Sequence, residues 1–161
     1  MAMGVIDRVV MKWRADGIGP NSGATAAAID RLEQQVGTRL PNDIRSFFAL
    51  ADGIADGYTD DYLLSFWPID KVISETADIR RSGYKIDPRD TPIADFLINS
   101  WFVFLRRSGE GQVGVWVEGV DIEFPSLESF FERYETDPDS LGLMRDSTYT
   151  RRNQGSTRDR Q

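Results

Sequence analysis

The sequence predicts an α+β fold: N-terminal helices, then an antiparallel sheet, then a C-terminal helix, with the helices packed on the sheet. Apolar residues recur mostly at helical spacing before residue 83. Between residues 95 and 124, short runs rich in aromatic and β-branched residues are separated by turn-forming residues. A further helical pattern follows residue 126. This order of elements is typical of an α+β domain.

The composition indicates one domain without cysteine or histidine chemistry. The chain has 161 residues, 40% of them hydrophobic, and a chain of this size buries about 70% of its extended surface. We expect a single domain over residues 1–144. The absence of Cys and His removes thiol and imidazole catalysis and zinc sites with nitrogen or sulfur ligands. We therefore expect no catalytic residue, no metal and no cofactor.

The charge is unevenly distributed along the chain. The net charge is −7, but five arginines and two aspartates follow residue 144, so the tail carries +3 and residues 1–144 carry −10. An acidic body repels nucleic acid and anionic membranes, and it accelerates encounter with a basic partner. An acidic surface also increases solubility. Net charge alone does not distinguish a role in solubility from attraction of a basic partner. The N-terminus has neither a signal peptide nor a membrane span, so we expect a cytoplasmic protein.

The first predicted helix covers residues 4–15. Its apolar positions follow helical spacing: Val5, Ile6, Val9, Val10 and Trp13. Glycine, proline and asparagine between residues 17 and 23 then break the helix, and Thr25 is placed to cap the next one.

Residues 29–53 predict two short helices joined by a tight connection. The first ends near Val36, because Gly37 adopts the left-handed conformation of a helix end without strain. The second begins at about Pro41, whose missing N–H would have no partner in a first turn. Asp43 then lies near the positive end of the helix dipole.

This helix pair resembles the signature of the SUKH superfamily, which includes bacterial toxin-immunity proteins and the yeast regulator of cell-wall synthesis. The matching positions are Ile29, Leu32, Glu33, Val36, Gly37, Leu40, Pro41, Asp43, Phe47 and Gly53. The chain departs from the family at Asp52-Gly53, where Asn-Gly is frequent; Asp-Gly forms a similar turn and adds a charge. The resemblance extends over Ala24 to Tyr134.

One strand and one helix are predicted after this pair. Residues from Tyr62 to Trp67 favour a strand, and Asp70 to Ser82 has helical spacing with Gly83 as its stop. The next stretch contains two prolines and three aspartates, so we expect no regular structure before Pro92.

Consecutive antiparallel strands are predicted next: Phe96–Ile98, Trp101–Arg107, Gln112–Glu118 and Val120–Phe124. A glycine-rich turn at residues 108–111 joins the second and third. The second is apolar on both faces, which predicts a central strand. A helix capped by Ser126 follows, with Leu127, Phe130, Phe131 and Tyr134 on its buried face. We expect residues 145–161 to form a flexible Arg-rich tail.

Two acidic stretches are candidate binding sites. The first is the loop that contains Asp52, Asp56, Tyr58, Asp60 and Asp61, whose spacing does not fit a calcium loop. Two interpretations stay open: the loop binds Lys and Arg side chains of a partner, or it is only a solvent-exposed loop.

The second stretch contains Glu118, Asp121 and Glu123, which would make a flat anionic surface on the last strand. Such charges can also serve only to protect a sheet edge from aggregation, which is the alternative interpretation.

We expect at least three of the four tryptophans to belong to the core.

The resemblance implies an immunity-type protein that binds and neutralises a cognate toxin, such as a nuclease or a deaminase. The expected contacts are Asp56, Tyr58, Asp60, Asp61, Glu118, Asp121 and Glu123. The expected partner is a basic protein, not nucleic acid or a membrane. Two alternatives stay open: a non-catalytic regulatory or scaffold protein, as the likeness to the yeast regulator implies, and a hydrolase that uses paired carboxylates.

Overall fold

A computed structural model of the chain describes residues 3–109 and 111–143, and the predicted Arg-rich tail lies outside these ranges. Within them, the helices are α1 (Val5–Ala15), α2 (Ala26–Val36), α3 (Asn42–Leu50), α4 (Ile69–Arg81), α5 (Leu127–Thr136) and the short 3-10 helix η1 (Pro138–Leu141). The strands are β1 (Leu64–Phe66), β2 (Asp90–Phe96), β3 (Trp101–Arg107), β4 (Val113–Val117) and β5 (Ile122–Phe124). The predicted α+β fold is confirmed.

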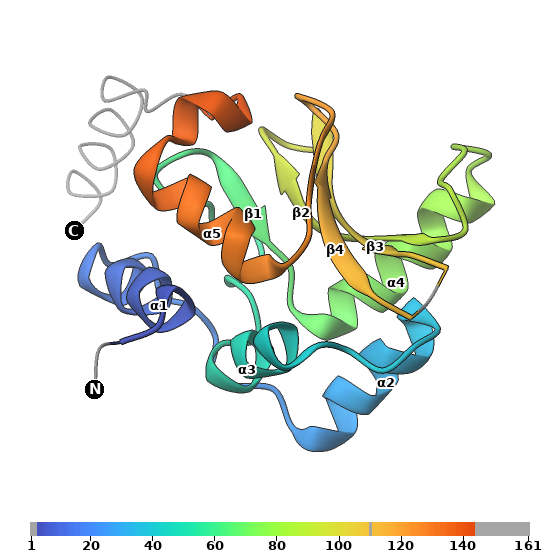
Figure 1. Ribbon diagram of the computed structural model, residues 1–161, viewed down its shortest axis with the longest axis horizontal. Coiled ribbons are helices and arrows are strands. Elements are labelled where there is room, and N and C mark those ends of the chain that lie inside the picture. Colours follow the sequence, from blue (N-terminus) through green and yellow to red (C-terminus); the bar gives the residue numbers. More distant parts are fainter. Residues whose placement is uncertain (1–2, 110, 144–161) are drawn as a thin grey trace.

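The sheet is antiparallel, and its strands lie in the order in which they occur in the chain, β1-β2-β3-β4-β5. β3 is central, as its two apolar faces predicted. Helix α5 packs on one face of the sheet with α1 and α3 beside it, whereas α4 packs on the other face with α2 against it (Figure 1). The sheet is therefore the middle layer of the described part of the chain.

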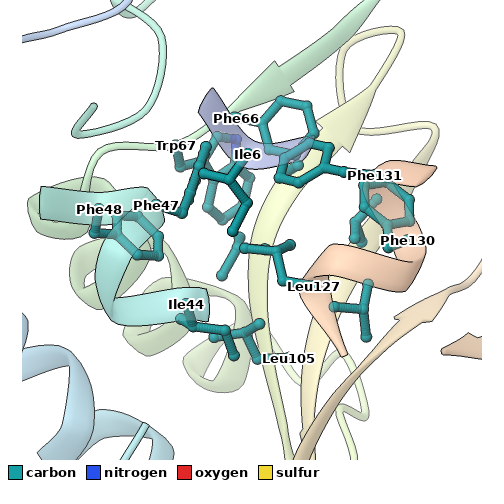
Figure 2. Packing of buried hydrophobic residues seen from close by; sticks show 14 of the residues in the cluster. Ile6, Ile44, Phe47, Phe48, Phe66, Trp67, Leu105, Leu127, Phe130 and Phe131 are labelled. Carbon is teal, nitrogen blue, oxygen red and sulfur yellow. The ribbon is translucent and has the colours of Figure 1, made fainter. Parts of the chain in front are cut away.

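The core is an aromatic cluster between the sheet and the first group of helices. Phe66 of β1 lies at its centre, with its ring centroid 5.1 Å from that of Trp13 and 5.6 Å from that of Phe131. Figure 2 shows α3 contributing Phe47 and α5 contributing Phe130 and Phe131 to this cluster. Aromatic rings bury large areas, so these contacts carry much of the hydrophobic stabilisation.

The four tryptophans divide into two groups. Trp13 and Trp67 are buried, as expected of core residues. Trp101 and Trp116 are only half-buried and pack against the edge of the core. The expectation of at least three core tryptophans is therefore wrong, because only two of the four are buried.

The predicted helix pair is confirmed together with the local signals that indicated it. Gly37 follows α2 with φ at +88°, and Pro41 directly precedes α3. Gly53 has φ at +68°, and a Cβ there would lie 2.4 Å from the carbonyl carbon of Trp67. Glycine is therefore required at position 53 both by its backbone conformation and by the close approach of another segment.

Replacing Thr25 by alanine is expected to lower the free energy of unfolding by about 1 kcal/mol. The Thr25 hydroxyl accepts a hydrogen bond from the Ala28 N–H at 3.1 Å, which satisfies one of the donors left open at the start of α2. Denaturant unfolding measures the effect, and Thr25→Ser is the matched control because serine retains the cap. Equal losses in both variants would contradict a capping role.

The first strand, β1, lies within the predicted strand Tyr62–Trp67, but the second strand was predicted wrongly. β2 begins at Asp90, not after Pro92, and residues 97–100 form a turn where a strand at Phe96–Ile98 was expected. Asp and Pro usually indicate a loop when only the local sequence is considered. Here the carboxylate of Asp90 is neutralised by Arg106 on the neighbouring strand, through two contacts of 2.7 Å. Pro92 is accommodated next to a break in register between Pro92 and Ala94.

Candidate partner-binding surface

The first acidic stretch begins with a residue that caps a helix. One carboxylate oxygen of Asp52 accepts the backbone N–H of Ile69 at 2.8 Å, at the start of α4. Burial raises the pKa of Asp52 above its ordinary value, and this hydrogen bond opposes the shift. An asparagine oxygen could accept the same bond, so the departure from Asn at this position preserves the turn and the cap.

Asp60 does not lie on the surface, which corrects the expectation that it contacts a partner. Its side chain is 4% exposed, and Oδ1 accepts the backbone N–H groups of Tyr62 at 2.8 Å and Leu64 at 2.9 Å. Oδ2 accepts the hydroxyl of Tyr134, which in turn accepts the indole N–H of Trp13 at 3.1 Å. Asp60 therefore connects the loop to α5 and α1, and its carboxylate is not available to another protein.

Burial raises the pKa of Asp60 from 3.8 to about 7, although the hydrogen bonds from Tyr134 and the two backbone N–H groups oppose the shift. Burial and the neighbouring Asp60 carboxylate also raise the pKa of Tyr134. A carboxyl group that folding makes harder to ionise binds its proton more tightly in the folded state than in the unfolded state. The stability of the protein should therefore depend on pH near neutrality.

Relative to that of Asp60→Asn, the free energy of unfolding is expected to fall as the pH rises from about 4 to about 7. Because the folded pKa of Asp60 is the higher one, its contribution is complete below the unfolded value of 3.8 and is lost as the pH rises through about 7. The loss should reach about 1.4 kcal/mol per pH unit within this window. Urea unfolding of both proteins across this range gives the comparison, and parallel pH profiles would contradict the raised pKa.

Two other residues of the loop are exposed, as the sequence predicted. Asp56 forms an ion pair with Lys71 of α4 at 2.8 Å, and the hydrogen bond from Lys71 lowers the pKa of Asp56. The side chain of Tyr58 is 62% exposed. Asp61 is half-buried in the turn that leads into β1. All three residues keep part of their surface in solvent.

The second acidic stretch is a turn followed by a strand. Asp121 precedes β5 with φ at +52°, so the predicted strand Val120–Phe124 is shortened by two residues. The Asp121 carboxylate accepts the indole N–H of Trp116 at 2.9 Å. Glu118 accepts the backbone N–H of Phe102 at 3.3 Å, and both acids keep part of their surface in solvent.

The expected anionic face of β5 also carries an arginine and an aromatic ring. Glu123 is exposed on the strand, but Arg106 lies 4.0 Å from its carboxylate. The Arg106 guanidinium is 4.2 Å from the ring centroid of Trp116, within the range of a cation–π interaction. Because Arg106 and Trp116 lie beside Glu123, this face is mixed in character and is not a uniformly negative surface.

Asp61, the last residue of the first acidic stretch, lies at the same end of the sheet as the second stretch. In an antiparallel sheet of this order, the residues before β1, the β2–β3 turn and the β4–β5 turn all lie at the same end. Neighbouring strands are about 4.8 Å apart, so the first residues of β1 and β5 are separated by roughly 19 Å along this end. Asp61 precedes β1 and Asp121 precedes β5 at this end, whereas Asp52 and Asp56 contact Ile69 and Lys71, which follow the other end of β1.

An apolar turn that the sequence did not single out lies between these acids. The side chains of Leu97 and Ile98 are 45% and 86% exposed, and both residues have positive φ, at +47° and +54°. A β-branched residue with positive φ is strained, and such strain concentrates at functional sites. The signal in the sequence is the pair Asn99-Ser100, which favours a turn directly after two apolar residues.

We name this surface the acidic rim. It consists of Asp61, Leu97, Ile98, Glu118 and Asp121. An exposed apolar centre between polar or charged residues is the usual anatomy of a protein-binding surface.

The two edges of the sheet differ. On β1, the carbonyl groups of Phe66 and Leu64 accept the N–H groups of Ile54 at 2.7 Å and Asp60 at 2.8 Å, which closes that edge. In the part of the chain that the structure describes, β5 pairs only with β4. The open edge therefore lies next to Glu123.

Within residues 3–109 and 111–143, no three Asp or Glu side chains gather into a set that could hold a metal ion. None of the helices found there has the length and apolar character that a membrane span requires.

Comparison with known proteins identifies one family. Residues 23–133 match the model of the SMI1 / KNR4 family (SUKH-1). The matched range begins after α1 and continues into α5, so it includes the whole sheet. No curated protein shows significant similarity to the chain.

Proposed function

Because the chain belongs to the SMI1 / KNR4 family (SUKH-1), we propose that it is an immunity-type protein that binds a cognate toxin and neutralises it. Family membership is the observation that carries this proposal. The family suggests a protein partner, and members of the wider superfamily include toxin-immunity proteins. The mechanism is occlusion of the toxin's active surface, without chemistry on the toxin.

The acidic rim supports the proposal through its shape and its charge. Ile98 offers an exposed apolar contact at the centre, where interface residues contribute most of the binding energy. Glu118 and Asp121 flank it on one side and Asp61 on the other. A toxin that acts on nucleic acid carries a basic surface, and a body of charge −10 attracts such a surface over long range.

The proposed contacts retain most of the residues that the sequence indicated, without Asp60 and with the apolar turn added. They are Asp56, Tyr58, Asp61, Leu97, Ile98, Glu118, Asp121 and Glu123. The proposed location is the cytoplasm, and the proposed fold unit is a single domain over residues 1–144.

Affinity capture of the full chain from its native host, followed by mass spectrometry, tests the proposal. Wild-type protein should retain one basic partner, and Ile98→Asp should reduce its retention at least about tenfold. Met11→Asp is the matched control, because Met11 is another exposed apolar residue, 50% exposed on α1. Equal retention by the two variants would contradict a role for the acidic rim.

The gene next to this one separates immunity from a scaffold role. A neighbouring gene for a large secreted protein with a variable C-terminal domain would support immunity. Capture of an endogenous signalling protein, without such a neighbour, would favour the regulatory alternative.

A further inference from the structure

The backbone of β5 is paired on one side only in the part of the chain that the structure describes. Its three residues pair with residues 115–117 of β4, and within the described ranges no backbone hydrogen bond reaches them from any other element. In an antiparallel ladder, alternate residues direct their N–H and C=O groups toward the neighbouring strand, and the residues between direct theirs away from it. β5 therefore presents backbone donors and acceptors that can pair with one more strand.

A strand added to β5 would meet different side chains on its two faces. Glu123 lies opposite Trp116 in the register, so the two side chains share one face of the sheet. Ile122 and Phe124 point to the other face, where the ring centroid of Phe124 lies 5.8 Å from that of Phe130 of α5. The added strand would therefore lie beside a carboxylate at one position and beside apolar side chains at the two flanking positions.

Glu123 decides which kind of strand fits this edge. Its side chain is 57% exposed, and Arg106 lies 4.0 Å from it while contacting Asp90 twice at 2.7 Å. Symmetric antiparallel pairing of β5 with the β5 of a second copy would place two Glu123 carboxylates opposite each other, and like charges in opposite positions are destabilising. A lysine or arginine opposite Glu123 is a favourable cross-strand pair instead. The edge thus disfavours self-association and favours a strand with a cationic residue at this position.

We propose that the protein partner adds a strand to the β5 edge, with a lysine or arginine opposite Glu123 and an apolar residue on either side of it. Main-chain hydrogen bonds supply the affinity in this mode of recognition, and alternating side chains supply the selectivity. The edge is continuous with the acidic rim, because Asp121 directly precedes β5. The inference rests on the proposed function and specifies how the backbone of the partner is bound.

NMR titration of the isotope-labelled full-length protein with the peptide acetyl-Thr-Thr-Val-Lys-Val-Thr-Thr-amide tests this inference. The amides of Ile122, Glu123 and Phe124 should shift most, with millimolar affinity. Glutamate in place of the peptide's lysine should weaken binding at least about fivefold, because like charges would then lie opposite each other. Glu123→Gln should reduce this preference for lysine, whereas Asp78→Asn, which removes an exposed acid of α4, should preserve it.

Two N-methylated forms of the peptide test the backbone pairing directly. In an added strand, either the lysine or the two valines direct their N–H groups toward β5. Methylation of the lysine nitrogen removes one set of donors, and methylation of both valine nitrogens removes the other. One form should lose binding and the other should retain it. Loss of binding by both forms or by neither would overturn the inference, as would a lack of shifts in β5 with the unmodified peptide.

The free protein shows whether another occupant already covers the edge. Shifts of the β5 amides that depend on protein concentration, in the absence of peptide, would assign the edge to a second copy. Slow hydrogen exchange of all three amides would show that the edge is covered within the chain. Either result would overturn the inference. Because these probes contain no toxin, such a failure would leave the capture experiment and the proposed function untouched, and a failed capture would leave the peptide result in place.

Discussion

Replacing Asp60 by alanine is expected to lower the free energy of unfolding by about 3–5 kcal/mol at about pH 5, below the raised pKa of this buried group. The change leaves the buried N–H group of Leu64 and the partly buried N–H group of Tyr62 without their acceptor. It also removes the acceptor of the Tyr134 hydroxyl and opens a cavity beside it. Each of these effects is individually costly, since buried polar groups in folded proteins are almost always paired.

Chemical denaturation of Asp60→Ala beside wild-type protein measures this loss. Asp56→Ala is the control, because Asp56 belongs to the same acidic loop but is exposed, and its removal should leave stability essentially unchanged. If the two variants behaved alike, Asp60 would not serve as the internal support of the loop.

Asp60 also illustrates what the sequence alone does not predict about the site, namely whether a carboxylate is buried or exposed. The sequence presents it as one of several acids in a polar loop, and nothing local distinguishes a carboxylate that faces solvent from one that accepts backbone N–H groups. The distinction depends on Tyr134, which is 74 residues away along the chain. Contacts of this kind exist only after the fold has formed.

Elements that depend on local chemistry were predicted well. Thr25, Gly37 and Ser126 mark helix ends through their own backbone or side-chain preferences, and the structure confirms all three. β2 was missed in part because Asp90 and Pro92 are tolerated in a strand only through Arg106 and a break in register.

The acidic rim could be identified only once the order of the strands in the sheet was known. Its acids belong to two separate stretches of the sequence, and the strand order places Asp61 at the same end of the sheet as Glu118 and Asp121. Ile98 was assigned to a strand, although the structure places it in an exposed turn with positive φ. The apolar centre of the rim could therefore not be recognised before the turn was located.

Neutralising the rim is expected to slow association with the captured partner at least about tenfold at low salt. The variant combines Asp61→Asn, Glu118→Gln and Asp121→Asn. The amide oxygens can still accept the hydrogen bonds from Phe102 and Trp116, so the fold should be retained. Charges act mainly on the encounter rate, and the dissociation rate should change less.

The salt dependence of the association rate provides the comparison. At about 0.1 M ionic strength charges are screened beyond roughly 10 Å, so the wild-type rate should fall steeply as salt is added and the variant's rate should fall less. A control variant removes three exposed acids elsewhere, through Asp30→Asn, Asp70→Asn and Asp78→Asn on α2 and α4. Equal slowing by both variants would assign the effect to net charge and not to the rim.

Titration of the protein into the captured partner, with the partner's own activity as the readout, tests the immunity function most directly. We predict that activity falls in proportion to the protein added and is abolished near one equivalent, because an occluding protein acts by stoichiometric binding. Ile98→Asp should require a larger excess, whereas Met11→Asp should match the wild type. A partner that binds the protein and retains full activity at saturation would contradict the proposed immunity function.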